Sequence, residues 1–450
     1  MQCSCLCQNC AGFGQPYRID FYILKQAIDF IGLCKTAQLI GINDLRAFAG
    51  AATFVVAALF PFALMAQTAP PPAAGPVAAS PQRGPGFLQL GPVVAYPGLD
   101  MQAGYNDNLY QRSANVIGSS MSSIAPYVRL ELRSAGNVYD LSYRSDFTRY
   151  HDRPADSYAN HLLQANARMV FNARNDARLR AEFRAGSDPR GSTDRGIADQ
   201  PDEWRQTMVS GMYGYGAQGN PGRLEFDGSW MSRRYVNNRA STAAADRDAT
   251  DLGAAFFWRV APKTRVFVQA RYALIEYADA GSRLTSTETR YLVGAQWDAT
   301  AKTTGYAKAG WMSKEFENGG SRTQSGASWD VGVRWSPLSY SVLDVSALRT
   351  FVESTGVGDT IISSRTSATW THAWNSRLNH NLYWVRTNDD FVGGGATRQD
   401  ETTTVGLKFN YQMQRWLRLG AELAHTERDS NDALFRYRRN LLLFSVGGSL

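Results

Sequence analysis

Charged and apolar side chains alternate in the stretch Arg178-Leu179-Arg180-Ala181-Glu182-Phe183-Arg184. In a β-strand successive side chains point to opposite faces, so the three arginines and the glutamate would share one face. A face of this kind that lined an aqueous channel would select solutes by charge. The alternative is that arginine–carboxylate pairs between neighbouring strands simply hold the sheet together. Both interpretations require a sheet that places one face toward water.

The same alternation places further charges on the corresponding face of other expected strands, and we treat these as candidate channel-lining residues. Arginine outnumbers the carboxylates, so we expect anionic solutes to be favoured, for example an acidic sugar polymer. The set comprises Arg129, Glu131, Arg133, Arg144, Asp146, Arg168, Arg178, Arg180, Glu182, Arg184, Arg223, Glu225, Asp227, Arg265, Arg271, Asp330, Arg334, Lys408, Arg418 and Glu422.

The elements that would position these residues are strands of about thirteen residues that recur from residue 93 to the end of the chain. Their connections alternate between short turns and longer polar loops. Short turns are expected at Ser134–Asn137, Ala173–Asp176, Gly219–Gly222, Ala261–Thr264, Thr300–Thr303, Ser336–Ser339, Trp374–Arg377 and Gln412–Arg415, and the clearest loops at Ser187–Glu203, Asn237–Arg247, Glu317–Arg322, Asp390–Gln399 and Asp429–Leu434.

This pattern predicts an all-β protein, a transmembrane antiparallel up-and-down β-barrel of about 18 strands. Sixteen is the next choice, because Pro97 interrupts the first strand. Apolar residues such as Leu224, Phe226 and Trp230 would face lipid. An open sheet edge within lipid would leave backbone groups unpaired, so the sheet must close. A barrel of this size encloses room for water. Outer-membrane barrels keep their short turns in the periplasm. Because an even number of strands brings the chain back to the side on which it started, both chain termini of the barrel are expected in the periplasm.

The N-terminal part of the chain is predicted to lie outside the barrel. Residues 1–66 are expected to be an N-terminal extension followed by a signal peptide, whose apolar run is Ala47–Ala66. A membrane-spanning helix is the alternative for that run. Residues 67–92 form an expected Pro/Ala-rich periplasmic linker, and residues 93–450 the outer-membrane barrel. All five cysteines fall within the first 34 residues, without the paired spacing of a zinc site.

Other classes of function find little support in the composition. The formal net charge of the 450 residues is +7, but no lysine- or arginine-rich block is present, so nucleic acid is not an expected partner. His161 and Asn166 could be imagined in a catalytic set, yet no spacing singles them out. We therefore expect no enzymatic activity, no cofactor and no metal.

Several short segments carry a family resemblance. They are Gly104-Tyr105-Asn106-Asp107-Asn108-Leu109-Tyr110, then Ser123-Ile124-Ala125-Pro126, Leu141-Ser142-Tyr143 and Asp188-Pro189-Arg190-Gly191. Their order resembles the outer-membrane barrel family called putative β-barrel porin 2, over most of the chain after Phe87. The resemblance implies a barrel in the bacterial outer membrane. It also implies a link to exopolysaccharide export, because members occur in such loci, and it carries over no catalytic residues.

The expected function is therefore passage of solute across the outer membrane, through a polar channel gated by outer loops such as Ser187–Glu203. The barrel could also be the outer-membrane component of exopolysaccharide export. The alternative is a non-conducting structural or interaction barrel, whose loops or Pro-rich tail bind a partner. Expected partners are outer-membrane lipid, a polysaccharide or small polar solute, and the barrel-assembly machinery, which would read the final strand Asn440–Leu450.

Overall fold

The computed structural model describes residues 87–449, except for residues 196–197, 218, 301, 318–321 and 355. The predicted N-terminal extension, the signal segment, the five cysteines and most of the predicted linker therefore lie outside the described residues. Among the described residues, no helix has the length and apolar character needed to cross a bilayer.

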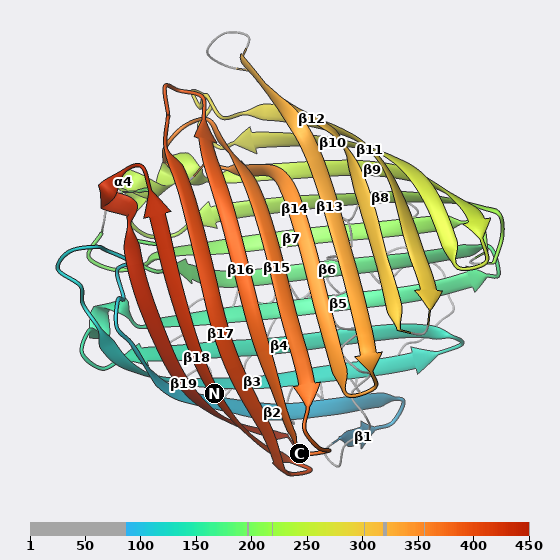
Figure 1. The fold of residues 1–450 in the computed structure, drawn as a ribbon, viewed down its shortest axis with the longest axis horizontal. Coiled ribbons are helices and arrows are strands. Elements are labelled where there is room, and N and C mark those ends of the chain that lie inside the picture. The colour runs from blue at the N-terminus through green and yellow to red at the C-terminus, as the bar shows by residue number, and fades with distance from the viewer. Residues whose placement is uncertain are drawn as a thin grey trace, which may run out of the picture. The chain divides into compact units, whose positions relative to one another are not determined.

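The described chain forms a closed antiparallel barrel in which each strand pairs with the next and β19 pairs back onto β2. The barrel strands are β2 Val93–Asn106, β3 Ser119–Ser134, β4 Asn137–Tyr150, β5 Tyr158–Asn172, β6 Asn175–Asp188, β7 Asp202–Tyr215, β8 Gly222–Tyr235, β9 Arg247–Ala261, β10 Thr264–Tyr277, β11 Ser286–Thr300, β12 Thr303–Phe316, β13 Arg322–Leu338, β14 Ser341–Glu353, β15 Thr360–Ala373, β16 Leu378–Val392, β17 Gln399–Gln414, β18 Leu417–Ser430 and β19 Tyr437–Ser449. Figure 1 shows β13–β19, in yellow to red, crossing in front of the green and teal strands of the other wall. The predicted up-and-down barrel of 18 strands is confirmed.

The connections alternate as expected between a short-turn end and a long-loop end of the barrel. Among the described residues, the loops contain four short helices, η1 Pro154–Asp156, α4 Arg239–Thr242, η2 Ala243–Ala245 and η3 Ala433–Phe435. The first residue of β2 and the last of β19 both lie at the short-turn end, since the number of barrel strands is even.

Two predicted turns are displaced along the chain. The turn expected at Ser336–Ser339 is formed by Ser339 and Tyr340, and the one expected at Gln412–Arg415 is formed by Arg415 and Trp416. In both hairpins the pairing register shifts near the end of the first strand, as in a β-bulge. Residues that were expected to form the turn therefore belong to the first strand.

A short strand, β1 Leu88–Leu90, lies within the stretch expected to be linker. It pairs with the start of β2 across a tight turn in which Gly91 has φ +62°. A positive φ suits glycine because it has no Cβ. Ordered structure therefore begins before Val93.

The two faces of the wall differ in composition. Cα partners on neighbouring strands share a face, and the row Leu224, Phe256, Val268 and Val293 carries large apolar side chains that are all exposed. On these strands, charged residues such as Arg223 and Arg271 occupy the alternate positions. An apolar outer face and a polar inner face are the pattern of a barrel that spans a membrane.

The regular wall is interrupted between β13 and β14 at the long-loop end. Pairing of these strands stops at Trp329 and Arg349. Beyond that point Glu353, the last residue of β14, forms an ion pair with Lys314 of β12 and accepts a hydrogen bond of 2.7 Å from Tyr277 of β10. The end of β14 therefore bends inward, behind the neighbouring strands.

Candidate functional site in the barrel interior

The candidate channel-lining residues all fall on strand positions that face the barrel interior. On β6, for example, Arg180 pairs with Asn166 and Ser210, whereas Leu179 points outward and is 39% exposed. The structure then divides these residues into two groups by burial and by the number of carboxylates that each cation contacts.

The first group consists of buried cations that each contact two carboxylates. Arg271, 3% exposed, forms ion pairs with Asp227 at 3.0 Å and with Asp251. Arg223, also 3% exposed, contacts Asp176 and Glu225, both at 2.7 Å. A buried charge needs such partners, because leaving water is costly. These predicted channel-lining residues face the interior, and their charges are paired with carboxylates of the wall.

The second group consists of exposed arginines that share carboxylates. Glu182 accepts from Arg180 and Arg184, both at 2.5 Å, and the arginine side chains remain 40% and 46% exposed. Glu131 is shared in the same way by Arg129 at 3.0 Å and Arg133 at 2.6 Å. Two positive charges per carboxylate leave net positive charge on this part of the inner face.

The same arrangement continues around the seam where β19 meets β2. Asp100 of β2 contacts Arg144 at 2.7 Å and Arg418 at 3.4 Å. Arg168 and Arg178 are Cα partners on β5 and β6, and both are exposed. Within the described part of the chain, neither of them forms an ion pair with a carboxylate. The basic surface therefore covers β3–β6 and extends to β18.

Most of the remaining candidates lie in ion pairs of one cation with one carboxylate. Asp146 accepts a hydrogen bond from Thr148 at 2.9 Å. The ion pairs are Asp330 with Lys308 at 3.3 Å, Arg334 with Asp344 at 2.8 Å and Lys408 with Glu422 at 3.1 Å. Arg265 is also engaged by a partner. For the three ion pairs, cross-strand pairing accounts for the charges.

A long loop lies between β6 and β7, and its described residues 189–195 and 198–201 include one that reaches the opposite side of the barrel. Asp194 of this loop forms an ion pair of 2.5 Å with Arg398, which lies between β16 and β17. Eight strands, β8–β15, separate the two loops on one side, and six, β18, β19 and β2–β5, separate them on the other. The contact therefore joins nearly opposite walls, and we call the described residues 189–195 and 198–201 the crossing loop.

Arg398 is held in a tight setting, which we call the Arg398 clasp and which comprises Asp194, Asp400, Phe391 and Phe435 around its guanidinium. The side chain is only 6% exposed. Its Nε donates to Asp400 at 2.9 Å. The ring centroids of Phe391 and Phe435 lie 4.3 and 3.3 Å from the guanidinium carbon. Cation–π contacts with two rings and ion pairs with two carboxylates together favour a single position of this arginine.

The crossing loop is also fixed near its start, on its own side of the barrel. Arg190 donates to both carboxylate oxygens of Asp156, each at 2.5 Å. The hydroxyl of Tyr110 donates to the same carboxylate at 2.8 Å. Burial, together with the hydrogen bond to Asp156, raises the pKa of Tyr110, so its hydroxyl stays protonated. The loop is therefore attached on both sides of the barrel at its long-loop end.

These loop residues were not among the predicted site residues. Arg190 belongs to the Asp188–Gly191 segment that carries the family resemblance, but no spacing linked it to Asp156 or Tyr110. Asp194 and Arg398 are 204 residues apart. No local pattern could indicate that contact, because it depends on the closure of the barrel.

The set imagined for catalysis is not assembled. His161 lies on the outer face, where its Nδ1 is 3.0 Å from the hydroxyl of Tyr143. Asn166 lies on the inner face and donates to Asp140. The described residues also contain no group of three or more histidines, cysteines or acids that could hold a metal ion.

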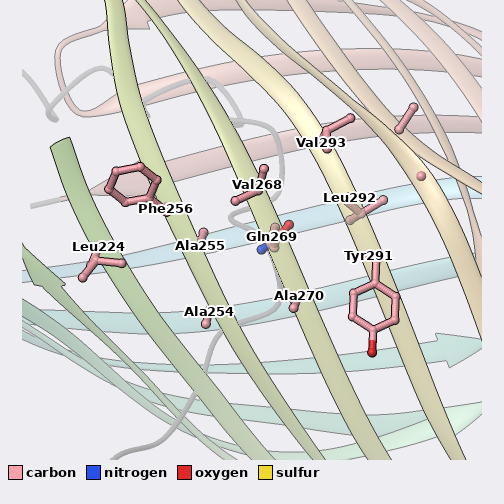
Figure 2. A pocket seen from close by; sticks show the side chains of 12 residues that line it. Leu224, Ala254, Ala255, Phe256, Val268, Gln269, Ala270, Tyr291, Leu292 and Val293 are labelled. Atoms are coloured by element: carbon pink, nitrogen blue, oxygen red, sulfur yellow. The ribbon is translucent and has the colours of Figure 1, made fainter. Parts of the chain in front are cut away.

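A shallow depression of about 440 Å³ lies on the wall formed by β8–β12. Figure 2 shows its lining, in which Leu224, Phe256, Val268 and Tyr291 surround small residues such as Ala254. These four large side chains belong to the apolar outer face, and none of the described residues that line the depression is charged.

Solved structures with a similar fold include an iron transporter and two Occ proteins. The FrpB iron transporter of Neisseria meningitidis (F3-3 variant) is 12% identical, with a TM-score of 0.44 and coverage of 74% of this chain and 62% of that one. OccK3 (OpdO) of Pseudomonas aeruginosa is 12% identical, with a TM-score of 0.44 and coverage of 78% and 95%. OccK2 (OpdF) of the same species, solved with glucuronate, is 10% identical, with a TM-score of 0.45 and coverage of 81% and 100%. No curated protein matches the sequence.

The family comparison covers nearly the whole barrel, since the match extends over residues 84–448. It agrees with the closed 18-stranded wall and with the location of this fold in the bacterial outer membrane. The chain belongs to the putative β-barrel porin 2 family and is a porin-like outer-membrane barrel.

Proposed function

We propose that the barrel passes polar solutes across the outer membrane and favours anions. The observation that carries this proposal is the sharing of carboxylates on the inner face: Glu131, Glu182 and Asp100 each serve two arginines. The exposed guanidinium groups attract anions and repel cations along β3–β6. The crossing loop limits the size of the solute at the long-loop end.

We further propose that the solute is an acidic polysaccharide and that the barrel is the outer-membrane component of its export. The excess of arginine on the inner face suits a chain of carboxylates. The short-turn end would then face the periplasm, where the assembly machinery would receive β19. The protein would act as a passive path, because the proposal requires charge and size selection but no bond chemistry.

A second candidate is a non-conducting barrel whose loops bind a partner. The observation that favours it is the crossing loop, which is fixed to opposite walls by Arg190 and by the Arg398 clasp. If the contact between Asp194 and Arg398 never opens, the crossing loop would block passage of solute. The exposed loops would then be the surface that binds the partner.

Conductance in planar bilayers distinguishes the two candidates. We expect protein purified from outer membranes to give stepwise currents whose reversal potential in a salt gradient shows anion selectivity. The double variant Arg180→Glu, Arg184→Glu should move selectivity toward cations, because it places two negative charges beside Glu182. Arg386→Glu is the control for a charge reversal away from the interior, since Arg386 lies on the outer face, where it pairs with Glu401. Silence from folded protein, or cation selectivity in the unchanged protein, would refute the anion channel.

A further inference from the structure

We propose that Arg168 and Arg178, with Arg133 beside them, form a binding site for carboxylates of an acidic saccharide near the short-turn end of the barrel. This inference rests on the proposed function and deepens it, because it names the residues that would first hold the anionic solute.

The three arginines lie on one row around the barrel wall. Arg133 on β3 pairs with Val138 on β4, Val138 pairs with Arg168 on β5, and Arg168 pairs with Arg178 on β6. Neighbouring strands are about 4.8 Å apart, so Arg168 and Arg178 are adjacent and Arg133 is about two strand spacings from Arg168. Arg168 lies four positions before the end of β5 at Asn172, close to the short-turn end.

The carboxylates nearest to this row are engaged elsewhere. Asp140 accepts from the side-chain amide of Asn166 at 2.8 Å. Asp176 contacts the buried Arg223 at 2.7 Å. Glu131 holds both Arg133 and Arg129. Two like charges directly opposite each other on neighbouring strands are unfavourable, so an anion that binds between them removes a repulsion as well as adding hydrogen bonds.

The chemistry of the guanidinium group indicates the ligand. It is planar and presents paired donors that match the two oxygens of a carboxylate, which makes arginine pairs selective for oxyanions. Because Arg168 and Arg178 are exposed, a solute in the interior can reach them, whereas the cations of the buried pairs are covered. Arginines that follow along β6, namely Arg180 and Arg184, extend the basic surface for further carboxylates of a polymer.

Binding can be measured by isothermal titration calorimetry of the full-length protein, purified from outer membranes into detergent. The probes are trigalacturonate, inorganic phosphate and the neutral maltotriose. We expect saturable binding of trigalacturonate, weaker binding of phosphate at the same site, and none of maltotriose. Arg168→Gln and Arg178→Gln should each weaken trigalacturonate binding about tenfold, which is the effect of losing roughly one charge-assisted hydrogen bond.

Arg386→Gln is the matched control, because it removes an exposed arginine from the outer face, and its affinity should equal that of the unchanged protein. Heat-dependent gel mobility verifies folding of every variant. If a glutamine variant does not fold, Arg168→Lys keeps the charge but removes the paired donors, and it should still weaken binding.

The proposed site is refuted if trigalacturonate does not bind, if phosphate binds as tightly, or if the Arg168 and Arg178 variants bind like the control. Conductance of the same preparation separates this test from that of the proposed function. Anion-selective currents with unchanged binding in the variants would overturn the site but not the channel. Arginine-dependent binding without currents would support the site and overturn the channel.

Discussion

Asp194→Asn is the substitution that tests the crossing loop most directly. The asparagine keeps the size of the side chain but removes the charge that contacts Arg398 at 2.5 Å on the opposite wall. Arg398 would retain Asp400 and the two phenylalanine rings, so the guanidinium would not become an isolated buried charge. The perturbation therefore acts mainly on attachment of the loop.

The magnitude follows from the type of contact that is lost. A hydrogen bond between two charged groups contributes about 1.5–3 kcal/mol. Losing it should raise the ratio of detached to attached loop by about 10-fold to about 150-fold, since 1.4 kcal/mol corresponds to a factor of ten. A loop that is detached one time in a thousand would then be detached in roughly one to thirteen per cent of molecules.

Spin labels can report this change as a distance distribution. Ser192 on the crossing loop and Thr397 beside Arg398 are both exposed and can carry labels after substitution by cysteine. The five native cysteines all lie within residues 1–34 and can be replaced by serine. We expect one narrow distance in the background protein and an added broad population in Asp194→Asn. Single-channel records should show more frequent visits to a higher conductance.

Asp199→Asn is the control, because Asp199 belongs to the same loop, is exposed, and forms no ion pair within the described residues. It changes the net charge by the same amount. If Asp194→Asn and Asp199→Asn give the same distances and the same currents, the clasp does not hold the loop and our reasoning about the constriction is wrong.

Two stability predictions follow from the faces of the wall. Arg271→Met should lower the free energy of unfolding by about 3–5 kcal/mol, because it removes a buried cation that two carboxylates share. Arg184→Gln, which breaks an exposed ion pair, should change the free energy of unfolding by less than about 1 kcal/mol. Urea titrations followed by tryptophan fluorescence measure both changes. Equal effects would show that burial does not separate the two groups. Val268→Arg, on the outer face, should cost about 2–4 kcal/mol in lipid vesicles if Val268 lies near the middle of the bilayer, and an unchanged unfolding curve would place it outside the membrane.

The sequence predicted which charged residues face the interior, but it did not predict which of them are buried in ion pairs and which are exposed. Alternation placed Arg180 and Arg271 on the same inner face, because strand geometry has a period of two. It could not show that Arg271 is covered and contacts Asp227 and Asp251, whereas Arg180 is open and shares Glu182 with Arg184. Burial depends on which side chains on neighbouring strands converge, and that is a property of register between strands.

The sequence by itself determined the fold class, the strand count, the alternation of short and long connections, and the side of the wall on which each charge lies. These features are local, because hydrophobic periodicity and turn residues act within one hairpin. Only the tertiary structure decided that the crossing loop reaches the opposite wall, that Asp194 contacts Arg398, and that the end of β14 bends inward to Lys314. Such contacts join residues distant in the chain, and they exist because closing the sheet brings opposite walls within reach of one loop.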